Sequence, residues 1–264
     1  MIFVRKRTFF YIAALLLLTG CGASSAKKKT TKAENDAAIV NPLSKAEADR
    51  YHDIAEDFYD SSLKRTGFNG AMLVAKKGQI VFEAYNGVER LKGKDTITAA
   101  TPFHIASTTK TFTAMAILKL AEEGKLSIND SLQKFFPQFP YVGMTVKTLL
   151  SQRSGLPNYA YYLEDVKWDK KIKITNEDVL QTLIAYKPSL QNPANRRFNY
   201  SNTNFVLLAL IIERVSGKLY GDYLQEVFFT PLQMTSTKVF NRNDSATVTP
   251  SYMWNGVQEA FTWL

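Results

Sequence analysis

The order of two kinds of hydrophobic pattern constrains the fold of this chain most strongly. Residues 70–87, GAMLVAKKGQIVFEAYNG, read as two strands joined by a turn at Lys77 and Gly78. Helical patterns dominate after this point, at about 107–123, 145–152, 176–186, 201–216 and 219–229. Strands followed by a block of helices indicate an α+β domain rather than a regular alternation of parallel strands and helices.

Two further segments carry structural patterns. Apolar residues recur at helical spacing between Ala48 and Phe58, and Ser44 stands where a helix N-cap is expected. Gly67 and Gly70 are expected to close that helix. Residues 95–106 suggest one more extended segment before the helical block.

The first twenty residues differ from the rest of the chain. A basic group, Arg5 to Arg7, precedes an apolar run from Phe9 to Leu18, which is shorter than the roughly 20 residues that a membrane-spanning helix needs. This pattern is typical of a signal peptide. Its end, Leu-Thr-Gly-Cys, resembles a bacterial lipobox, which implies cleavage after residue 20 and lipidation of Cys21. The alternative is a plain secretory signal with an unrelated cysteine.

We therefore divide the chain into a signal peptide at 1–20, a flexible tether at 21–43 and a folded domain at 44–264. The expected location is the bacterial cell envelope, where an exported protein is held to a membrane through the lipid on Cys21. Loss of the signal peptide lowers the net charge from +9 to +6. No basic run interleaves with aromatic residues, so no nucleic-acid partner is expected.

Cysteine and histidine are scarce. Cys21 is the single cysteine, which excludes an intramolecular disulfide and a thiolate metal cluster. No metal or organic cofactor is implied.

A candidate nucleophile lies at the start of the strongest helical pattern. The spacing S-x-x-K begins at Ser24, Ser25, Ser61, Ser107 and Ser131. Of these, Ser107 alone opens a strongly apolar helix, whose positive end favours developing negative charge. Lys110 falls on the same helix face, with Cβ atoms roughly 5–6 Å apart. The structural alternative is that Ser107 only caps the helix.

A serine nucleophile needs a base within hydrogen-bond reach. His52 and His104 are the two histidines, and neither is expected beside Ser107. The G-x-S-x-G pattern of α/β-hydrolases is absent from the sequence. The remaining candidates for the base are a desolvated lysine and a tyrosine of lowered pKa. Of the 13 tyrosines, only Tyr200 begins a Y-x-N pattern.

With these residues the chain resembles the class C type of serine β-lactamases, together with penicillin-binding proteins and related esterases. Ser107 and Lys110 match the first motif of that family, and Tyr200-Ser201-Asn202 matches the second. The segment LLSQRSGLPNY between them resembles a helix and loop of the family. The resemblance implies an antiparallel sheet beside an all-helical lobe. It also implies that Ser107 is acylated, that Lys110 and Tyr200 move its proton, and that Asn202 orients the substrate.

A third motif of the family, Lys-or-His-x-Gly, is not found after Asn202, where the glycines are Gly217, Gly221 and Gly256. In the family this motif lies on a strand that supplies one oxyanion donor. We therefore expect residues 44–264 to be the N-terminal part of the domain, without the C-terminal strands of its sheet. We also expect the 264-residue chain alone to be impaired or inactive.

Three interpretations follow from the sequence. The leading one is an envelope-anchored serine hydrolase that forms an acyl-enzyme with a β-lactam, a D-alanyl peptide or an ester. The second is a catalytically incomplete lipoprotein of the same fold that binds peptidoglycan or penicillin. The third is a disrupted remnant without a stable fold. The expected partners are a small-molecule or peptidoglycan-derived substrate and the membrane.

Overall fold

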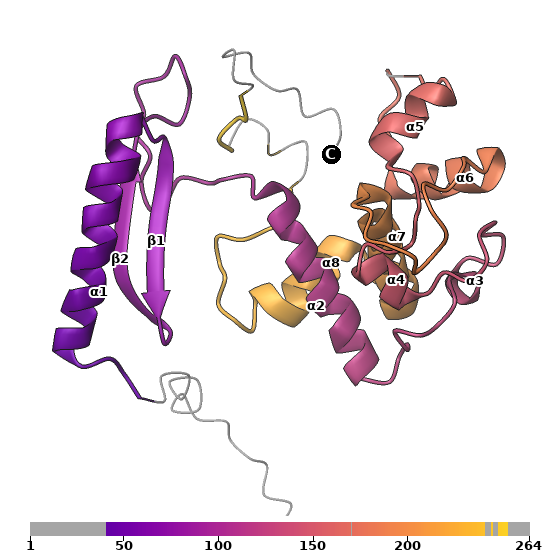
Figure 1. Cartoon of the computed structure of the whole chain (residues 1–264), viewed down its shortest axis with the longest axis horizontal. Coiled ribbons are helices and arrows are strands. Elements are labelled where there is room, and N and C mark those ends of the chain that lie inside the picture. Colours follow the sequence, from indigo (N-terminus) through magenta and orange to yellow (C-terminus); the bar gives the residue numbers. More distant parts are fainter. Residues whose placement is uncertain (1–40, 170, 241–243, 245–247, 253–264) are drawn as a thin grey trace, which may run out of the picture.

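The computed structural model describes residues 41–169, 171–240, 244 and 248–252. Within them, one helix lies along a two-stranded sheet, and most other helices form a separate lobe (Figure 1). Helix α2, Thr109–Glu122, lies between these two parts in the view of Figure 1. The arrangement confirms the predicted α+β class.

The first helix begins where its sequence predicts. The Ser44 side chain accepts the N–H of Glu47, and the Glu47 carboxylate accepts the N–H of Ser44, so the two form a capping box. Gly67 ends the helical segment with a φ of 76°, a left-handed conformation that glycine adopts without strain. The segment comprises α1, Lys45–Phe58, followed by the short helical turns η3, Tyr59–Leu63, and η4, Lys64–Thr66.

The sheet is an antiparallel hairpin of β1, Gly70–Lys76, and β2, Gln79–Asn86. Lys77 and Gly78 both have positive φ, 51° and 77°, as the tight turn between twisted strands requires. Helix α1 covers one face of the hairpin, where Phe82 contacts the buried side chains of α1 and η3.

The segment before α2 differs from the expectation of an extended strand. Among the described residues of 95–106, one isolated bridge joins Thr96 to Val88, and no strand forms. A turn follows, in which Thr101 donates its N–H to the Thr98 carbonyl and accepts the Thr98 N–H on its hydroxyl. Threonine hydroxyls compete for backbone groups in this way and favour turns over strands.

The helical lobe follows the predicted order. The segments expected at about 107–123, 145–152, 176–186, 201–216 and 219–229 appear as α2, α4, α6, α7 and the pair α8 and η6. The short helices α3 and α5 were not expected. The bounds are α3, Leu132–Phe135; α4, Val146–Leu150; α5, Tyr159–Asp165; α6, Asn176–Tyr186; α7, Asn202–Ser216; α8, Tyr220–Leu224; and η6, Gln225–Phe229.

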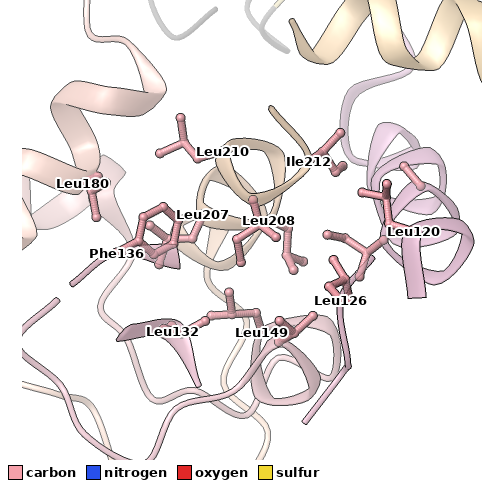
Figure 2. Close-up of a cluster of buried hydrophobic side chains, with 14 of the residues drawn as sticks. Leu120, Leu126, Leu132, Phe136, Leu149, Leu180, Leu207, Leu208, Leu210 and Ile212 are labelled. Atoms are coloured by element: carbon pink, nitrogen blue, oxygen red, sulfur yellow. The ribbon is translucent and has the colours of Figure 1, made fainter. Parts of the chain in front are cut away.

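Helix α7 is at the centre of the lobe and lies against α2, α4, α5, α6 and α8. Leu207 and Leu208 of α7 are fully buried, as is Leu120 of α2 (Figure 2). Burial of one such side chain contributes roughly 1.5–3 kcal/mol. This packing fixes α2 against α7, and thereby holds the start of α2 near the start of α7.

No helix in the described ranges is both long and apolar enough to cross a membrane. The predicted signal peptide, Cys21 and most of the predicted tether lie outside the described residues.

Candidate active site

Ser107 lies in a tight turn immediately before α2. The turn is the 3₁₀ segment Ala106–Thr108, and Ala106 has a φ of 44°. A left-handed conformation is unfavourable for alanine, and strain of this kind concentrates at functional sites. The helix N-cap is Thr108, which makes no capping bond with its side chain. Ser107 therefore does not cap α2, and its hydroxyl makes other contacts.

Three sequence-predicted residues meet at the Ser107 hydroxyl. Lys110, in the first turn of α2, donates from Nζ to Ser107 Oγ over 3.1 Å. The Tyr200 hydroxyl lies 2.9 Å from the same oxygen, across a separation of 93 residues in the sequence. The Ser107 hydroxyl is thus within hydrogen-bond distance of both groups that the sequence proposes as its proton acceptors.

Tyr200 has the electrostatic surroundings of a base. The Lys110 ammonium, and after it the Ser107 hydroxyl, hold the pKa of the Tyr200 phenol below its ordinary value, because both stabilise the phenolate. The Lys110 Nζ lies 5.1 Å from the centroid of the Tyr200 ring and 5.6 Å from that of Phe205. Tyr200 is 48% exposed, so a substrate can reach it.

Asn202 is the first residue of α7, directly after Ser201, which is the N-cap. Asn202 is therefore not the cap of α7. Its Oδ1 is buried and has no hydrogen-bond partner among the described residues. Asn202 lines the same pocket as Ser107, which is where the resemblance to the family places a substrate-orienting amide.

The site opens into a pocket of about 690 Å³. The starts of α2, α6 and α7 contribute to its wall, together with Tyr159 and Tyr220. Among the described residues that line it, Lys110 and Lys173 are basic and none is acidic. The wall of the pocket therefore favours a negatively charged ligand.

Sequence reasoning missed several residues of this wall. Lys173, Phe205 and Tyr159 carry no local motif, and each reaches the pocket only through the packing of the lobe. His104, which was not expected to act as the base, also lines the pocket, and its ring packs 6.0 Å from that of Phe240.

One group of potential metal ligands occurs in the described part of the chain, and it lies on α1. His52, Asp53 and Glu56 have ligand atoms within 4.8 Å of one another, and all three are exposed. The group belongs to a different element from the pocket residues, so it has no part in the site at Ser107.

Comparison with known proteins places these residues in a family. Residues 55–260 match the family model described as Beta-lactamase. Penicillin-binding protein 4* of Bacillus subtilis (strain 168) is 37% identical over 175 residues, which cover 66% of this chain and 39% of that protein. Protein flp of Staphylococcus aureus (strain N315) is 34% identical over 182 residues, which cover 67% of this chain and 36% of that protein. The chain thus spans less than two fifths of the length of these relatives.

Solved structures of penicillin-binding proteins and of an amidase are also similar to this chain. A penicillin-binding protein from Bacillus halodurans is 27% identical with a TM-score of 0.63, covering 78% of this chain and 62% of its own. A penicillin-binding protein homologue from Pyrococcus abyssi is 28% identical with a TM-score of 0.63, and the match covers 84% of this chain and 51% of that homologue. A D-amino acid amidase from Ochrobactrum anthropi SV3 is 25% identical with a TM-score of 0.56, covering 74% and 55%. This likeness confirms the predicted β-lactamase and transpeptidase type of fold, and the chain belongs to the Beta-lactamase family of penicillin-binding-protein-like serine hydrolases.

Proposed function

We propose that this protein is an envelope-anchored serine hydrolase that works through an acyl-enzyme on Ser107. The observation that carries the proposal is the meeting of two groups at Ser107 Oγ, with Lys110 Nζ 3.1 Å and the Tyr200 hydroxyl 2.9 Å from that oxygen. A hydroxyl between a cation and a phenol of lowered pKa is an activated nucleophile.

The proposed reaction has two halves. The Tyr200 phenolate takes the proton of Ser107 while Oγ attacks the substrate carbonyl, and the resulting oxyanion collapses as the leaving amine or alcohol takes the proton from Tyr200. The product of this half is an ester of Ser107. Water then attacks that ester and gives a proton to Tyr200. The second oxyanion collapses as Tyr200 returns the proton to Ser107 Oγ, which releases the acid and restores both the serine and the phenolate. Lys110 stabilises the phenolate in both halves.

The proposed substrates are acyl donors with a negative charge, namely β-lactams or D-alanyl peptides, with small esters as simpler substrates. The two lysines and the lack of acidic side chains among the described pocket residues support this class. The names of the relatives support it too, since they include penicillin-binding proteins and an amidase for D-amino acids. Asn202 is proposed to bind the acyl side of the substrate.

Labelling of the natural protein with a fluorescent penicillin tests the proposal. The wild type is expected to form one covalent adduct, and Ser107→Ala none. Ser61→Ala is the matched control, because Ser61 begins another S-x-x-K on an exposed turn after α1. Labelling that persists in Ser107→Ala would contradict the assignment. A wild-type adduct that never hydrolyses would favour a penicillin-binding role over hydrolysis.

The proposed anchor is a lipid on Cys21. Its support is the lipobox-like sequence alone, because Cys21 lies outside the described residues. Cys21→Ala is expected to move the protein from the membrane fraction to the soluble fraction and to abolish incorporation of labelled palmitate. Two results together would contradict the anchor, namely Cys21→Ala that stays in the membrane fraction and wild-type protein that incorporates no palmitate.

A further inference from the structure

The residue after the cap of α4 has an unusual backbone conformation for its type. Helix α4 ends at Leu150 with Ser151 as its C-cap, and Gln152 follows with a φ of 55°. Gln152 donates its N–H to the Leu149 carbonyl, and Arg153 donates to that of Thr148, which is the hydrogen-bond pattern of a Schellman motif. Glycine is the usual residue at this position, because it has no Cβ to clash in the left-handed region.

The side chain of Gln152 is what distinguishes it from other residues of this conformation. Eight non-glycine residues with positive φ occur in the described ranges, and Gln152 is the one among them with a buried side chain, 6% exposed. A glutamine held at positive φ with its amide inside the protein indicates a specific use for that amide.

The amide and the backbone of Gln152 bond to the two residues that flank Tyr200. The N–H of Asn199 donates to the Gln152 carbonyl over 2.8 Å. The N–H of Ser201 donates to Gln152 Oε1 over 3.0 Å. The backbone on both sides of Tyr200 is therefore tied to a single residue of another loop.

A buried network fixes the orientation of the Gln152 amide. Asn204 Nδ2 donates to Gln152 Oε1, and Ser154 Oγ donates to Asn204 Oδ1. Ser154, Ser201 and Asn204 are each 0% exposed. Gln152 Nε2 has no partner in the described part of the chain, so the network uses the acceptor atom of the amide and not its donor.

We propose that Gln152 is a positioning residue, which holds the Tyr200 hydroxyl against Ser107 and Lys110 by fixing the backbone on both sides of Tyr200. Gln152 does not touch the reacting atoms. Gln152 acts through the segment 199–201, which carries Tyr200. The left-handed conformation of Gln152, just after α4, brings the Gln152 amide to that segment. This proposal rests on the function proposed above.

Gln152→Met tests the proposal, because methionine keeps the length of the side chain and removes the acceptor. The phenol then moves away from Lys110 and Ser107, and the acylation rate constant is expected to fall by about 10²-fold. The acid limb of the pH–rate profile is expected to shift to higher pH, since the pKa of Tyr200 rises towards its ordinary value. The substitution leaves unchanged the titratable groups that line the pocket, which are Lys110, His104, Lys173, Tyr159 and Tyr220.

Two variants separate positioning from general loss of structure. Gln152→Glu keeps an acceptor for the N–H of Ser201 and for Asn204 Nδ2. On the alkaline plateau of its pH–rate profile, this variant is expected to recover most of the acylation rate that Gln152→Met loses. Gln233→Met is the matched control, because Gln233 also has a positive φ, 56°, but is exposed and outside the segment that holds Tyr200. Gln152→Met with the rate and acid limb of the wild type would overturn the proposal.

Asn204→Asp serves if Gln152→Met does not fold. An acceptor at position 204 turns the Gln152 amide, so that Nε2 faces it and Oε1 no longer accepts from Ser201. The acid limb of the pH–rate profile of Asn204→Asp is expected to shift to higher pH, by less than in Gln152→Met. An unshifted limb in this folded variant would overturn the proposal.

A readout without activity separates this proposal from the proposed function. The ¹³Cζ resonance of Tyr200, identified by its loss in Tyr200→Phe, reports the titration of the phenol directly. A lower pKa in the wild type than in Gln152→Met supports the positioning role even if no substrate acylates the enzyme. Absence of acylation in the wild type would contradict the proposed function alone, and equal titration in the two proteins would contradict the positioning role alone.

Discussion

Lys110 affects the candidate nucleophile through two kinds of contact. It donates a hydrogen bond to Ser107, and its charge lies over the rings of Tyr200 and Phe205. It is also the largest cause of the lowered pKa of Tyr200. A lysine one helical turn from the nucleophile thus lowers the pKa of a tyrosine that is distant in the sequence.

Removal of this charge gives a pH-dependent prediction. In Lys110→Met the pKa of Tyr200 rises, because its main stabilising neighbour is lost. Tyr200 accepts a proton only in its phenolate form, so the acid limb of acylation is expected to shift to higher pH and the rate at pH 7 to fall. Stopped-flow acylation across pH measures both. Lys119→Met, in the last turn of the same helix, is the control, and an unmoved limb in Lys110→Met would refute this role.

The pocket charge gives a prediction about substrates. Two unit charges about 4 Å apart interact by about 1 kcal/mol in water. Lys173→Glu replaces an attraction by a repulsion, a change of about 2 kcal/mol, and is expected to lower kcat/KM for an ester with a carboxylate on its acyl chain by about 30-fold relative to a neutral ester. Lys171→Glu makes the same charge change at an exposed residue that is not part of the described wall. Equal effects of the two variants would show that Lys173 has no specific contact with the substrate.

At the scale of elements, the loop between α4 and α5 brings the two halves of the site together. Gly155, in this loop, has a φ of 78°, and a Cβ built on it would lie 1.9 Å from the Asn192 carbonyl oxygen. Its own carbonyl accepts the N–H of Gln191. This close approach fixes the segment around residue 192 against the loop that carries Gln152. The fixed segment leads directly to Tyr200 in the sequence.

Gly155→Ala is therefore expected to destabilise the protein and to impair the site. Gly124→Ala is the matched control, since Gly124 has a similar φ of 71° but has no atom within 4 Å of the added Cβ. The difference between the two variants isolates the clash, and is expected to be about 1–3 kcal/mol in the free energy of unfolding. Denaturant titration measures it, and equal losses of stability would mean that the loop can move aside.

The elements differ in how far the sequence could predict them. The ends of α2 and α7 could be placed because Gly124 and Gly217 each stop a helix locally, and the start of α1 because Ser44 and Glu47 lie within one turn. The meeting of Ser107 with Tyr200 followed only from a resemblance, since no local rule relates residues so distant. The contacts of Gln152 could not be predicted, because a position that normally favours glycine holds a side chain whose partners come from another loop.

At the scale of the molecule, most of the described buried hydrophobic residues fall into two clusters, one in the helical lobe and one between α1 and the sheet. Ser107 and Tyr200 precede α2 and α7, whose buried faces both belong to the lobe cluster. The geometry of the site therefore depends on the stability of the lobe. Tyr162 lies in that cluster, 3% exposed, and bonds to Thr182 and to the Val179 carbonyl.

Tyr162 gives a prediction for stability against pH. Burial raises the pKa of Tyr162 to about 12, so its contribution to stability is complete below pH 10 and is lost as the pH rises through 12. Tyr162→Phe is expected to lower stability near pH 8 by about 1 kcal/mol through the lost hydrogen bonds, and to flatten the decline of Tm above pH 10. Tyr161→Phe, at a neighbouring residue that is 75% exposed, is expected to change neither. An equally steep decline in Tyr162→Phe would contradict the assignment.

The role of Ser107 as the nucleophile is tested most simply by locating the acyl group on the natural protein after incubation with a penicillin. Mass spectrometry of the digested protein identifies the modified residue. We predict a single adduct on Ser107, formed more slowly in Tyr200→Phe and Lys110→Met and absent from Ser107→Ala. An adduct on another residue, or an unmodified Ser107 with a penicillin that binds, would contradict that role.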